Sequence, residues 1–420
     1  IGLTVNYYAA RIGWSGGREN RLATAPFPAI ADWYMHMTVP PGHLFGYGDG
    51  HTRAPLKADW MAAIASATQD PVIQGYALHY RSIKADPFHL LCLDSDLAAC
   101  SPQGCLPLGR AFHHHGATIA SRTSWDFDQT ASVVGSKARR EDNHEHNDPG
   151  QVVIDGEGQP LIVDRGKSGT AYPAGFFTEN RFRYYDTNAF GHNILVFGGR
   201  EMKSCYELHP NHTSGPLHGK RALHAQGHIV SSEFDDTWGG QWTIDTTAAW
   251  DGVIRNLRTV LHIHPGFVVV LDEAQLETTE SISLRWNTVK KPTLVGDDGF
   301  SLQSEGVGLA ARVLNLNADE TTYRLGNHQY KAPWNMDQFG TELEQREAPY
   351  FETLIEADHC RLLSLCTVQP DNQTVAWTQE GNTHIGLIGD AQLKVTVYDT
   401  SFAISSSCHQ KAWSISTRKN

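Results

Sequence analysis

The chain has 420 residues, of which 40% are hydrophobic and 19% are charged, and this composition is typical of a folded globular protein. Its formal net charge of −12, from 34 lysines and arginines against 46 aspartates and glutamates, argues against binding to nucleic acid or to an anionic membrane. No apolar run reaches the roughly 18 to 20 residues of a membrane-spanning helix, so we expect no membrane partner. At about 150 residues a domain, the length favours two or three domains.

Helical periodicity is confined to the first part of the chain. Apolar residues recur every three to four positions in 6–12, 56–67 and 71–83, which predicts three helices. Residues 86–108 are rich in proline, glycine, serine and aspartate, as in a linker or a long loop. We therefore predict a helical region with its linker at 1–108.

After residue 108 the pattern changes to alternating apolar and polar runs. Residues 151–164 (QVVIDGEGQPLIVD) and 258–275 (RTVLHIHPGFVVVLDEAQ) are typical of paired strands around a short turn. Turns of two to five residues are too short for crossover helices, so the strands should be antiparallel. The predicted fold class is α+β, with a β domain at 109–335 and a C-terminal β-sheet region at 336–420.

The densest group of chemically active side chains is the stretch DNHEHND at 142–148. His144 and His146 are two residues apart and would share one face of an extended strand. Asp164 ends the next apolar hairpin, and His192 precedes another apolar run. Two imidazoles and a carboxylate from three strand ends suit a divalent metal ion such as zinc. The alternative interpretation is a set of turn histidines beside capping residues.

Residues from about 112 to 290 resemble the C-terminal β domain of the heparinase II/III-like polysaccharide lyases. The motifs that carry the resemblance are RTSW at 122–125, the stretch 142–166, FGHNILVFGG at 190–199 and RWNT at 285–288. LTVNYYAAR at 3–11 also resembles the family segment in which a tyrosine follows an asparagine on an inner helix of an (α/α) toroid. The resemblance implies a partial (α/α) toroid followed by an antiparallel β supersandwich.

The activity that the resemblance implies is β-elimination from a uronic-acid polysaccharide of the glycosaminoglycan, alginate or ulvan type, which leaves unsaturated uronyl ends. Removing the weakly acidic C5 proton requires a neutralised substrate carboxylate, a base, and an acid for the leaving oxygen. By resemblance, Asn143 and His144 neutralise the carboxylate, and Tyr7 takes the proton and donates one to the glycosidic oxygen. Tyr8 is the alternative to Tyr7, and is otherwise predicted to bind substrate.

His146, Asp164 and His192 match the metal ligands of the same family. The implied cofactor is Zn²⁺, or another divalent ion, which acts there as a structural support beneath the active-site loop. Such an ion would fix the three strand ends and, through them, the neighbouring His144.

Four further residues are candidates for substrate binding. Arg122 and Trp125 would line a sugar subsite, with arginine for a carboxylate or sulfate and tryptophan for the ring face. Tyr172 and Tyr185 lie between the second and third predicted metal ligands in sequence, where a loop could reach the cleft. For all four, ordinary packing is the alternative.

The chain also departs from the family pattern. The family places a further catalytic histidine well before the tyrosine, whereas Ile1 lies only six residues before Tyr7. We therefore expect a separate N-terminal chain or segment to complete the toroid. Two other functions stay open, namely a uronyl C5-epimerase and a non-catalytic carbohydrate-binding protein. The sequons at 211–213 and 372–374 favour a secreted or periplasmic protein.

Overall fold

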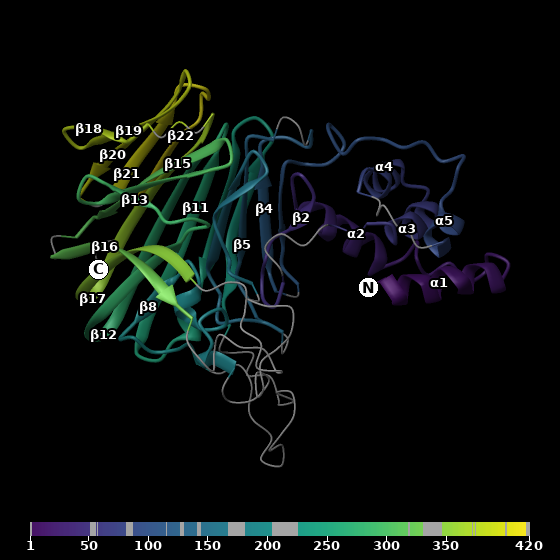
Figure 1. Cartoon of the computed structure of the whole chain (residues 1–420), viewed down its shortest axis with the longest axis horizontal. Helices are drawn as coiled ribbons and strands as arrows, with labels where there is room; N and C mark the ends of the chain where they lie inside the picture. The colour runs from purple at the N-terminus through teal and green to yellow at the C-terminus, as the bar shows by residue number, and fades with distance from the viewer. Residues whose placement is uncertain are drawn as a thin grey trace, which may run out of the picture.

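The computed structural model describes residues 2–50, 56, 58–80, 87–114, 116–126, 130–140, 144–166, 181–203, 226–317, 320–330, 347–371, 373, 375–399 and 401–416. Within these residues, no helix combines the length and the apolar character needed to cross a bilayer. Figure 1 shows a helical part beside a larger β part.

The helical part consists of α1 (Gly2–Trp14), α2 (Phe27–His36), α3 (Met61–Thr68), α4 (Pro71–His79) and α5 (Pro87–Cys92). Helix α4 begins where its sequence predicts, because the Asp70 side chain accepts hydrogen bonds from the backbone N–H groups of Val72 and Ile73. The inner faces of these helices share one apolar core that includes Trp60 and Ile64. These helices alone do not establish an (α/α) toroid, which stays a prediction.

Two helices differ from the sequence prediction. Helix α2 was not predicted, although Phe27, Ala31 and Met35 are buried at four-residue spacing. Pro28 lies in its first turn, where a proline costs no hydrogen bond. Helix α5 lies inside the predicted linker.

The described strands form four antiparallel sheets. A two-stranded sheet contains β1 (Thr38–Val39) and β2 (His43–Leu44). A five-stranded sheet contains β3 (Gly109–Phe112), β4 (Thr118–Arg122), β5 (Ser132–Lys137), β6 (Gln151–Gly156) and β7 (Gln159–Ile162). A second five-stranded sheet contains β18 (Thr378–Glu380), β19 (Thr383–Ile388), β20 (Ala391–Tyr398), β21 (Ser401–Ser406) and β22 (Ala412–Ser416). The prediction of antiparallel sheets is confirmed, and the described part of the chain is mostly β-sheet with few helices.

The largest sheet has ten strands in the described part of the chain. Its strands are β8 (Leu195–Phe197), β9 (His228–Asp235), β10 (Gly239–Asp245), β11 (Val253–Ile263), β12 (Phe267–Asn287), β13 (Thr293–Val295), β14 (Gly299–Ser304), β15 (Val307–Asn315), β16 (Thr321–Gln329) and β17 (Glu347–Pro370). Strands β12 and β17 pair along most of their lengths. The predicted boundary at 335/336 therefore falls between strands of one sheet, whereas the boundary at 108/109 coincides with the start of β3.

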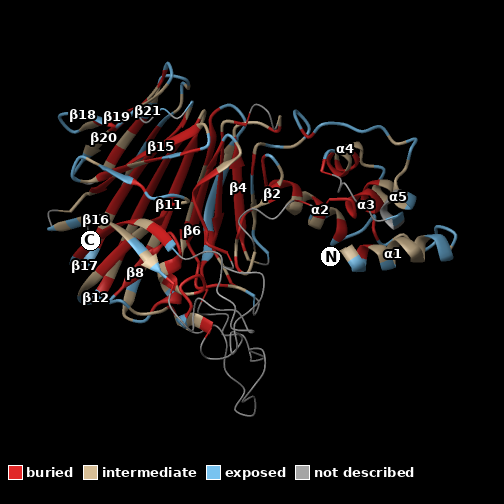
Figure 2. Cartoon of the chain, in the orientation of Figure 1, coloured by how far each residue is buried: buried red, intermediate tan, exposed pale blue. Residues whose placement is uncertain are grey.

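The central strands of the large sheet are buried on both faces, so the β part has three layers (Figure 1). Val268 and Val270 of β12 pack with residues of the β3–β7 sheet such as Ile154. The alternate residues Val269 and Leu271 pack instead with residues of the C-terminal sheet. The period-two alternation of a strand sends successive side chains into the two cores. Figure 2 shows this burial across the sheets, in contrast to α1, whose residues are mostly intermediate or exposed.

Candidate active and metal site

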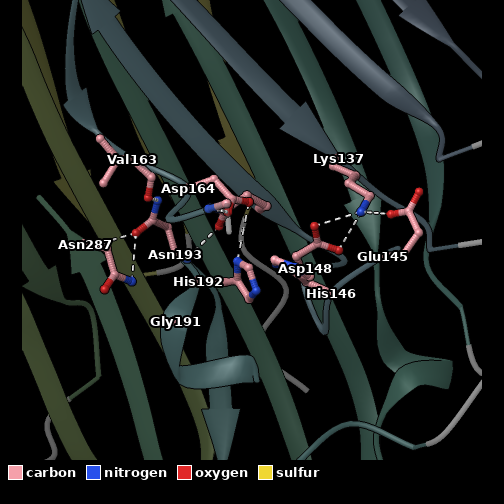
Figure 3. A network of polar contacts seen from close by, with 12 residues as sticks. Lys137, Glu145, His146, Asp148, Val163, Asp164, Gly191, His192, Asn193 and Asn287 are labelled. Atoms are coloured by element: carbon pink, nitrogen blue, oxygen red, sulfur yellow. Dashed lines mark hydrogen bonds and ion pairs between the residues drawn. The ribbon is translucent and has the colours of Figure 1, made fainter. Parts of the chain in front are cut away.

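His146, Asp164 and His192 converge below the surface, between the β3–β7 sheet and the large sheet. All three are fully buried, and one ligand atom of each lies within 4.8 Å of the others. Nδ1 of His192 is 3.4 Å from Oδ2 of Asp164. Figure 3 shows the three side chains together. The structure thus brings together the three residues that the sequence singles out as metal ligands.

The neighbouring Asn193 holds the strand ends that carry these residues. Its side-chain N–H group donates to the carbonyl of Val152, at 2.8 Å, and to that of Val163, at 3.0 Å. Its side-chain oxygen accepts from the backbone N–H of Asn287 at 2.6 Å (Figure 3). One asparagine therefore joins β6, the end of the β7 segment and β12 next to His192 and Asp164.

A buried ion pair supports the same region from the large sheet. Arg258 donates to both carboxylate oxygens of Asp272, at 2.7 and 3.0 Å. It also donates to the carbonyl of Gly150 at 2.8 Å and to that of Asn193. The cluster is consequently anchored on rigid strands, which is the setting that a metal site requires.

The three residues fit a divalent cation. Nδ1 of His146 and both ring nitrogens of His192 receive no hydrogen bond from any described residue, although both rings are fully buried. Such unsatisfied groups are costly inside a protein, and coordination to an ion would satisfy them. Two imidazoles and one carboxylate also form a common protein ligand set for zinc, with room for a further ligand.

The protonation of the two histidines follows from their surroundings. Burial lowers the pKa of His146, which favours the neutral ring that a metal requires. Burial acts in the same direction on His192, but the negative charge of the adjacent Asp164 carboxylate outweighs it and raises the pKa of His192. A cation in the cluster would take the place of that proton.

Asp49 completes the site, and the sequence analysis missed it. Its Oδ2 is 2.8 Å from Nδ1 of His144, and its Oδ1 is 2.9 Å from Nε2 of His146. Nη2 of Arg181 donates to Oδ1 at 3.0 Å. Burial alone would raise the pKa of Asp49, but the contacts with His146, Arg181 and His144 outweigh it and lower this pKa to about 2.

The loop that carries Asp49 has the sequence GYGDG at 46–50. Gly48 has a φ of +60°, and a Cβ at this position would lie 2.6 Å from the carbonyl oxygen of His144. The backbone N–H of Asp49 donates to that same oxygen at 2.9 Å. The glycine pattern was therefore a signal for close backbone approach, although it did not name the partner segment.

Lys137 anchors the other side of the segment that bears the histidines. Its Nζ lies 2.8 Å from both oxygens of Asp148 and also contacts the carboxylate of Glu145 (Figure 3). Lys137 and Asp148 are both buried. This contact fixes the segment around His146 without exposing a charge.

The predicted catalytic residues are not all brought together. His144 is accessible, with 54% of its side chain exposed. Asp49 links it to the cluster, because the Asp49 carboxylate contacts both His144 and His146. Asn143 and Tyr172 lie outside the described residues. Tyr7 is exposed on α1, which runs away from the β-sheets along the outer edge of the helical part (Figure 1). Tyr8, partly buried, packs edge-on against Phe27.

Three residues predicted to bind substrate are buried. Arg122 and Trp125 have no exposed surface, and the guanidinium lies 3.8 Å from the centre of the indole ring. Tyr185 is 5% exposed and donates to the side-chain oxygen of Asn287 at 3.0 Å. A polysaccharide cannot reach side chains that are covered by the protein. These three residues therefore pack the interior and do not form the sugar subsite that the sequence predicted.

Comparisons with known proteins agree with this architecture. Residues 106–378 match the family described as "Heparinase II/III-like, C-terminal". A search of the curated proteins found no match.

Solved structures with a similar fold include a heparinase III, which is 15% identical, has a TM-score of 0.61, and is matched over 94% of this chain and 55% of that chain. The heparan sulfate lyase HepC from Pedobacter heparinus is 16% identical, with a TM-score of 0.59 over 92% of this chain and 52% of that one. A heparinase III gene product with methylated lysines is 12% identical, with a TM-score of 0.62 over 99% of this chain and 56% of that one.

The chain thus spans about half the length of these structures, and at such identities the likeness concerns the fold. The family match covers well over half of the chain and includes the buried cluster and the exposed histidine beside it. The chain therefore belongs to the heparinase II/III-like family.

Proposed function

We propose that this chain is part of a polysaccharide lyase that cleaves a uronic-acid-containing polymer by β-elimination. The observation that carries the proposal is the exposed His144, held by Asp49 directly beside the buried cluster of His146, Asp164 and His192. A reactive side chain on a rigid support of this kind suits catalysis. The family match and the fold likeness support the same conclusion.

The reaction assigns a task to each accessible group. The C5 proton becomes removable when the adjacent carboxylate is neutralised and the developing negative charge is stabilised. His144, through its imidazole, and Asn143, through its amide, are proposed to bind that carboxylate. The proton must then pass to a base, and the leaving O4 must receive one, which gives an unsaturated uronyl end.

The proposed resident ion is Zn²⁺, held by His146, Asp164 and His192. When bound, it supplies coordination bonds that tie together the three chain segments carrying these residues. Those bonds would keep the backbone at His146 fixed, and His144 with it. We therefore propose that the metal ligands affect turnover indirectly, by holding His144 in position.

Tyr7 stays a prediction as the proton-transfer group. Tyr7 is exposed on α1, and its proposed role requires that its hydroxyl reach the substrate bound at His144. Replacement of Tyr7 by phenylalanine tests this directly, since loss of the hydroxyl would abolish turnover while leaving the zinc content unchanged. A separate N-terminal chain or segment is proposed to complete the toroid.

The substrate class is tested with a panel of polymers. The similar structures named above are two heparinase III structures and a heparan sulfate lyase, so heparan-type glycosaminoglycans head the panel, followed by alginate and ulvan. The measurement is ultraviolet absorbance of the unsaturated uronate, with and without His144→Ala. We expect a rise on at least one polymer and a loss of about 10²-fold or more in the variant.

The same experiment separates the alternatives. A C5-epimerase would give no absorbance but would exchange the C5 hydrogen with deuterated water. A non-catalytic carbohydrate-binding protein would bind a polymer and do neither. Either result would overturn the lyase proposal. Location outside the cytoplasm, secreted or periplasmic, is a separate proposal that cell fractionation tests.

A further inference from the structure

We propose that Asp49 is a positioning residue that sets the tautomers of both His144 and His146, and so couples the metal cluster to the exposed histidine. Its kinetic consequence rests on the proposed function, whereas its structural consequence does not. The inference starts from a single carboxylate with one oxygen on each histidine.

The chemistry of the contacts fixes the direction of both hydrogen bonds. An ionised carboxylate can only accept, so each imidazole nitrogen that faces Asp49 must carry the hydrogen. A neutral imidazole has a single N–H group. His144 must therefore carry it on Nδ1, and His146 must carry it on Nε2.

The tautomer inferred for His146 agrees with an independent feature of the structure. With the hydrogen of His146 on Nε2, its Nδ1 becomes a lone-pair donor. Nδ1 is the buried nitrogen of His146 that receives no hydrogen bond from a described residue, and His146 belongs to the cluster with Asp164 and His192. The tautomer that Asp49 imposes is thus the one that a cation in this cluster requires.

The first tautomer determines how His144 meets a substrate. With Nδ1 bonded to Asp49, the neutral ring presents Nε2 as an acceptor. Asp49 therefore fixes which ring nitrogen the half-exposed side chain can present to a substrate.

Asp49 is fixed through both its side chain and its backbone. Arg181 donates to Oδ1, and the backbone N–H of Asp49 donates to the carbonyl of His144. The glycine at 48 permits this close approach. The side chain of Asp49 is only 5% exposed. Its geometry is therefore set by the fold before a substrate arrives.

The test uses Asp49→Asn, because an amide is isosteric but accepts through only one oxygen and donates through its nitrogen. The matched control is Asp358→Asn, since Asp358 also contacts Nδ1 of a histidine, at 2.6 Å, but both side chains are exposed on β17. Three quantities are compared: zinc affinity, kcat and KM on the polymer that the wild type cleaves, and the histidine tautomers.

The tautomers are read from nitrogen NMR of isotope-labelled histidine at about pH 8, above the ordinary histidine pKa of about 6.5. In the wild type we expect an Nδ1–H signal for His144 and an Nε2–H signal for His146. Asp49→Asn should abolish one of these, weaken zinc binding by about 10- to 100-fold, and lower kcat by a similar factor. KM should stay within about twofold, because Asp49 does not touch substrate.

Three results would overturn the proposal: an Nε2–H signal for His144 in the wild type, unchanged tautomers in Asp49→Asn, or equal effects of Asp358→Asn. The wild-type spectrum is decisive even where the variant does not fold. Failure of the proposed function looks different, because a wild type that cleaves no uronate polymer would still show both tautomers and bind zinc.

Discussion

At the scale of single residues, His192 links the site to the stability of the fold. Its ring is fully buried, and neither nitrogen receives a hydrogen bond from a described residue. A ligand that binds only the folded state stabilises it, by about 2.7 kcal/mol when its free concentration is about 100 times its Kd. We predict that a chelator lowers the melting temperature of the wild type, and that His192→Ala loses bound zinc and this sensitivity together.

The control for this prediction is His359→Ala, because His359 is a largely exposed histidine on β17. It should retain zinc and respond to the chelator like the wild type. Zinc content by elemental analysis and calorimetric melting are the two measurements. A wild type purified without zinc that also fails to bind added zinc would refute the assignment.

The ionisation of Glu352 makes the folding stability of the protein depend on pH. Its side chain is 2% exposed and lies between Arg285, at 2.8 Å, and Arg324. Burial would raise the pKa of Glu352, but the two arginines outweigh it and lower this pKa from the ordinary 4.5. A lowered folded-state pKa means stabilisation that is fully present above about pH 4.5 and is lost as the pH falls through the folded value.

We therefore predict that Glu352→Gln destabilises the protein near neutral pH, and that the difference from the wild type shrinks on acidification below about pH 4.5. Urea denaturation at several pH values measures it. Glu356→Gln on the same strand is the control, because Glu356 is exposed. A difference that stays constant with pH would contradict the role of the ion pairs.

At the scale of elements, the sequence predicted individual strands better than it predicted which strands belong to the same sheet. Apolar runs placed β11 and β12, since a continuous run such as FVVVL at 267–271 is typical of a strand buried on both faces. The first half of β17 escaped because charged residues such as Glu352 and Glu356 interrupt its apolar pattern. Pairing partners are non-local, so a boundary drawn from composition could divide one sheet.

The candidate site was predictable to the same extent. His146, Asp164 and His192 follow from residue type, spacing and a resemblance. Asp49 does not, because it lies 95 residues before His144 and nothing in the local sequence states which segments will touch. The sequence also did not show which side chains are buried. Burial makes Arg122 a structural residue, although the sequence made it a candidate for substrate binding.

Arg122 joins two elements, the end of α2 and the strand β4. Its Nη2 donates to the carbonyls of His36, at 2.7 Å, and Thr38, at 2.8 Å, and its guanidinium stacks on Trp125. Lysine cannot reproduce a planar donor that bridges two carbonyls and stacks on a ring. We predict that Arg122→Lys destabilises the chain by about 2–4 kcal/mol in chemical denaturation, because two buried carbonyls lose a charged donor.

The comparison for this change is Arg110→Lys, in which an arginine that is 47% exposed and paired with Asp32 should tolerate the change within about 0.5 kcal/mol. The KM of Arg122→Lys for the substrate polymer should also match that of the wild type. A raised KM without loss of stability would instead restore Arg122 as a substrate contact.

At the scale of the whole molecule, the helical part presents an unusual surface. Leu3, Tyr7 and Trp14 of α1 are 87%, 54% and 76% exposed. Their spacing of four and seven residues places them along one face of the helix. Exposed apolar side chains grouped in this way mark a contact surface or an aggregation liability. The separate N-terminal chain or segment proposed to complete the toroid would cover this face.

We predict that the double variant Leu3→Ser and Trp14→Ser binds less of an apolar dye and self-associates less in analytical ultracentrifugation, while its melting temperature stays unchanged. Neither side chain is buried in the core of the helical part, so stability has no reason to fall. A matched pair at the inner face, Val5→Ser and Ile64→Ser, should unfold the helices because both side chains are fully buried. A lower melting temperature for the outer pair would show that α1 already packs through this face, and the proposal of a further segment against it would then be lost.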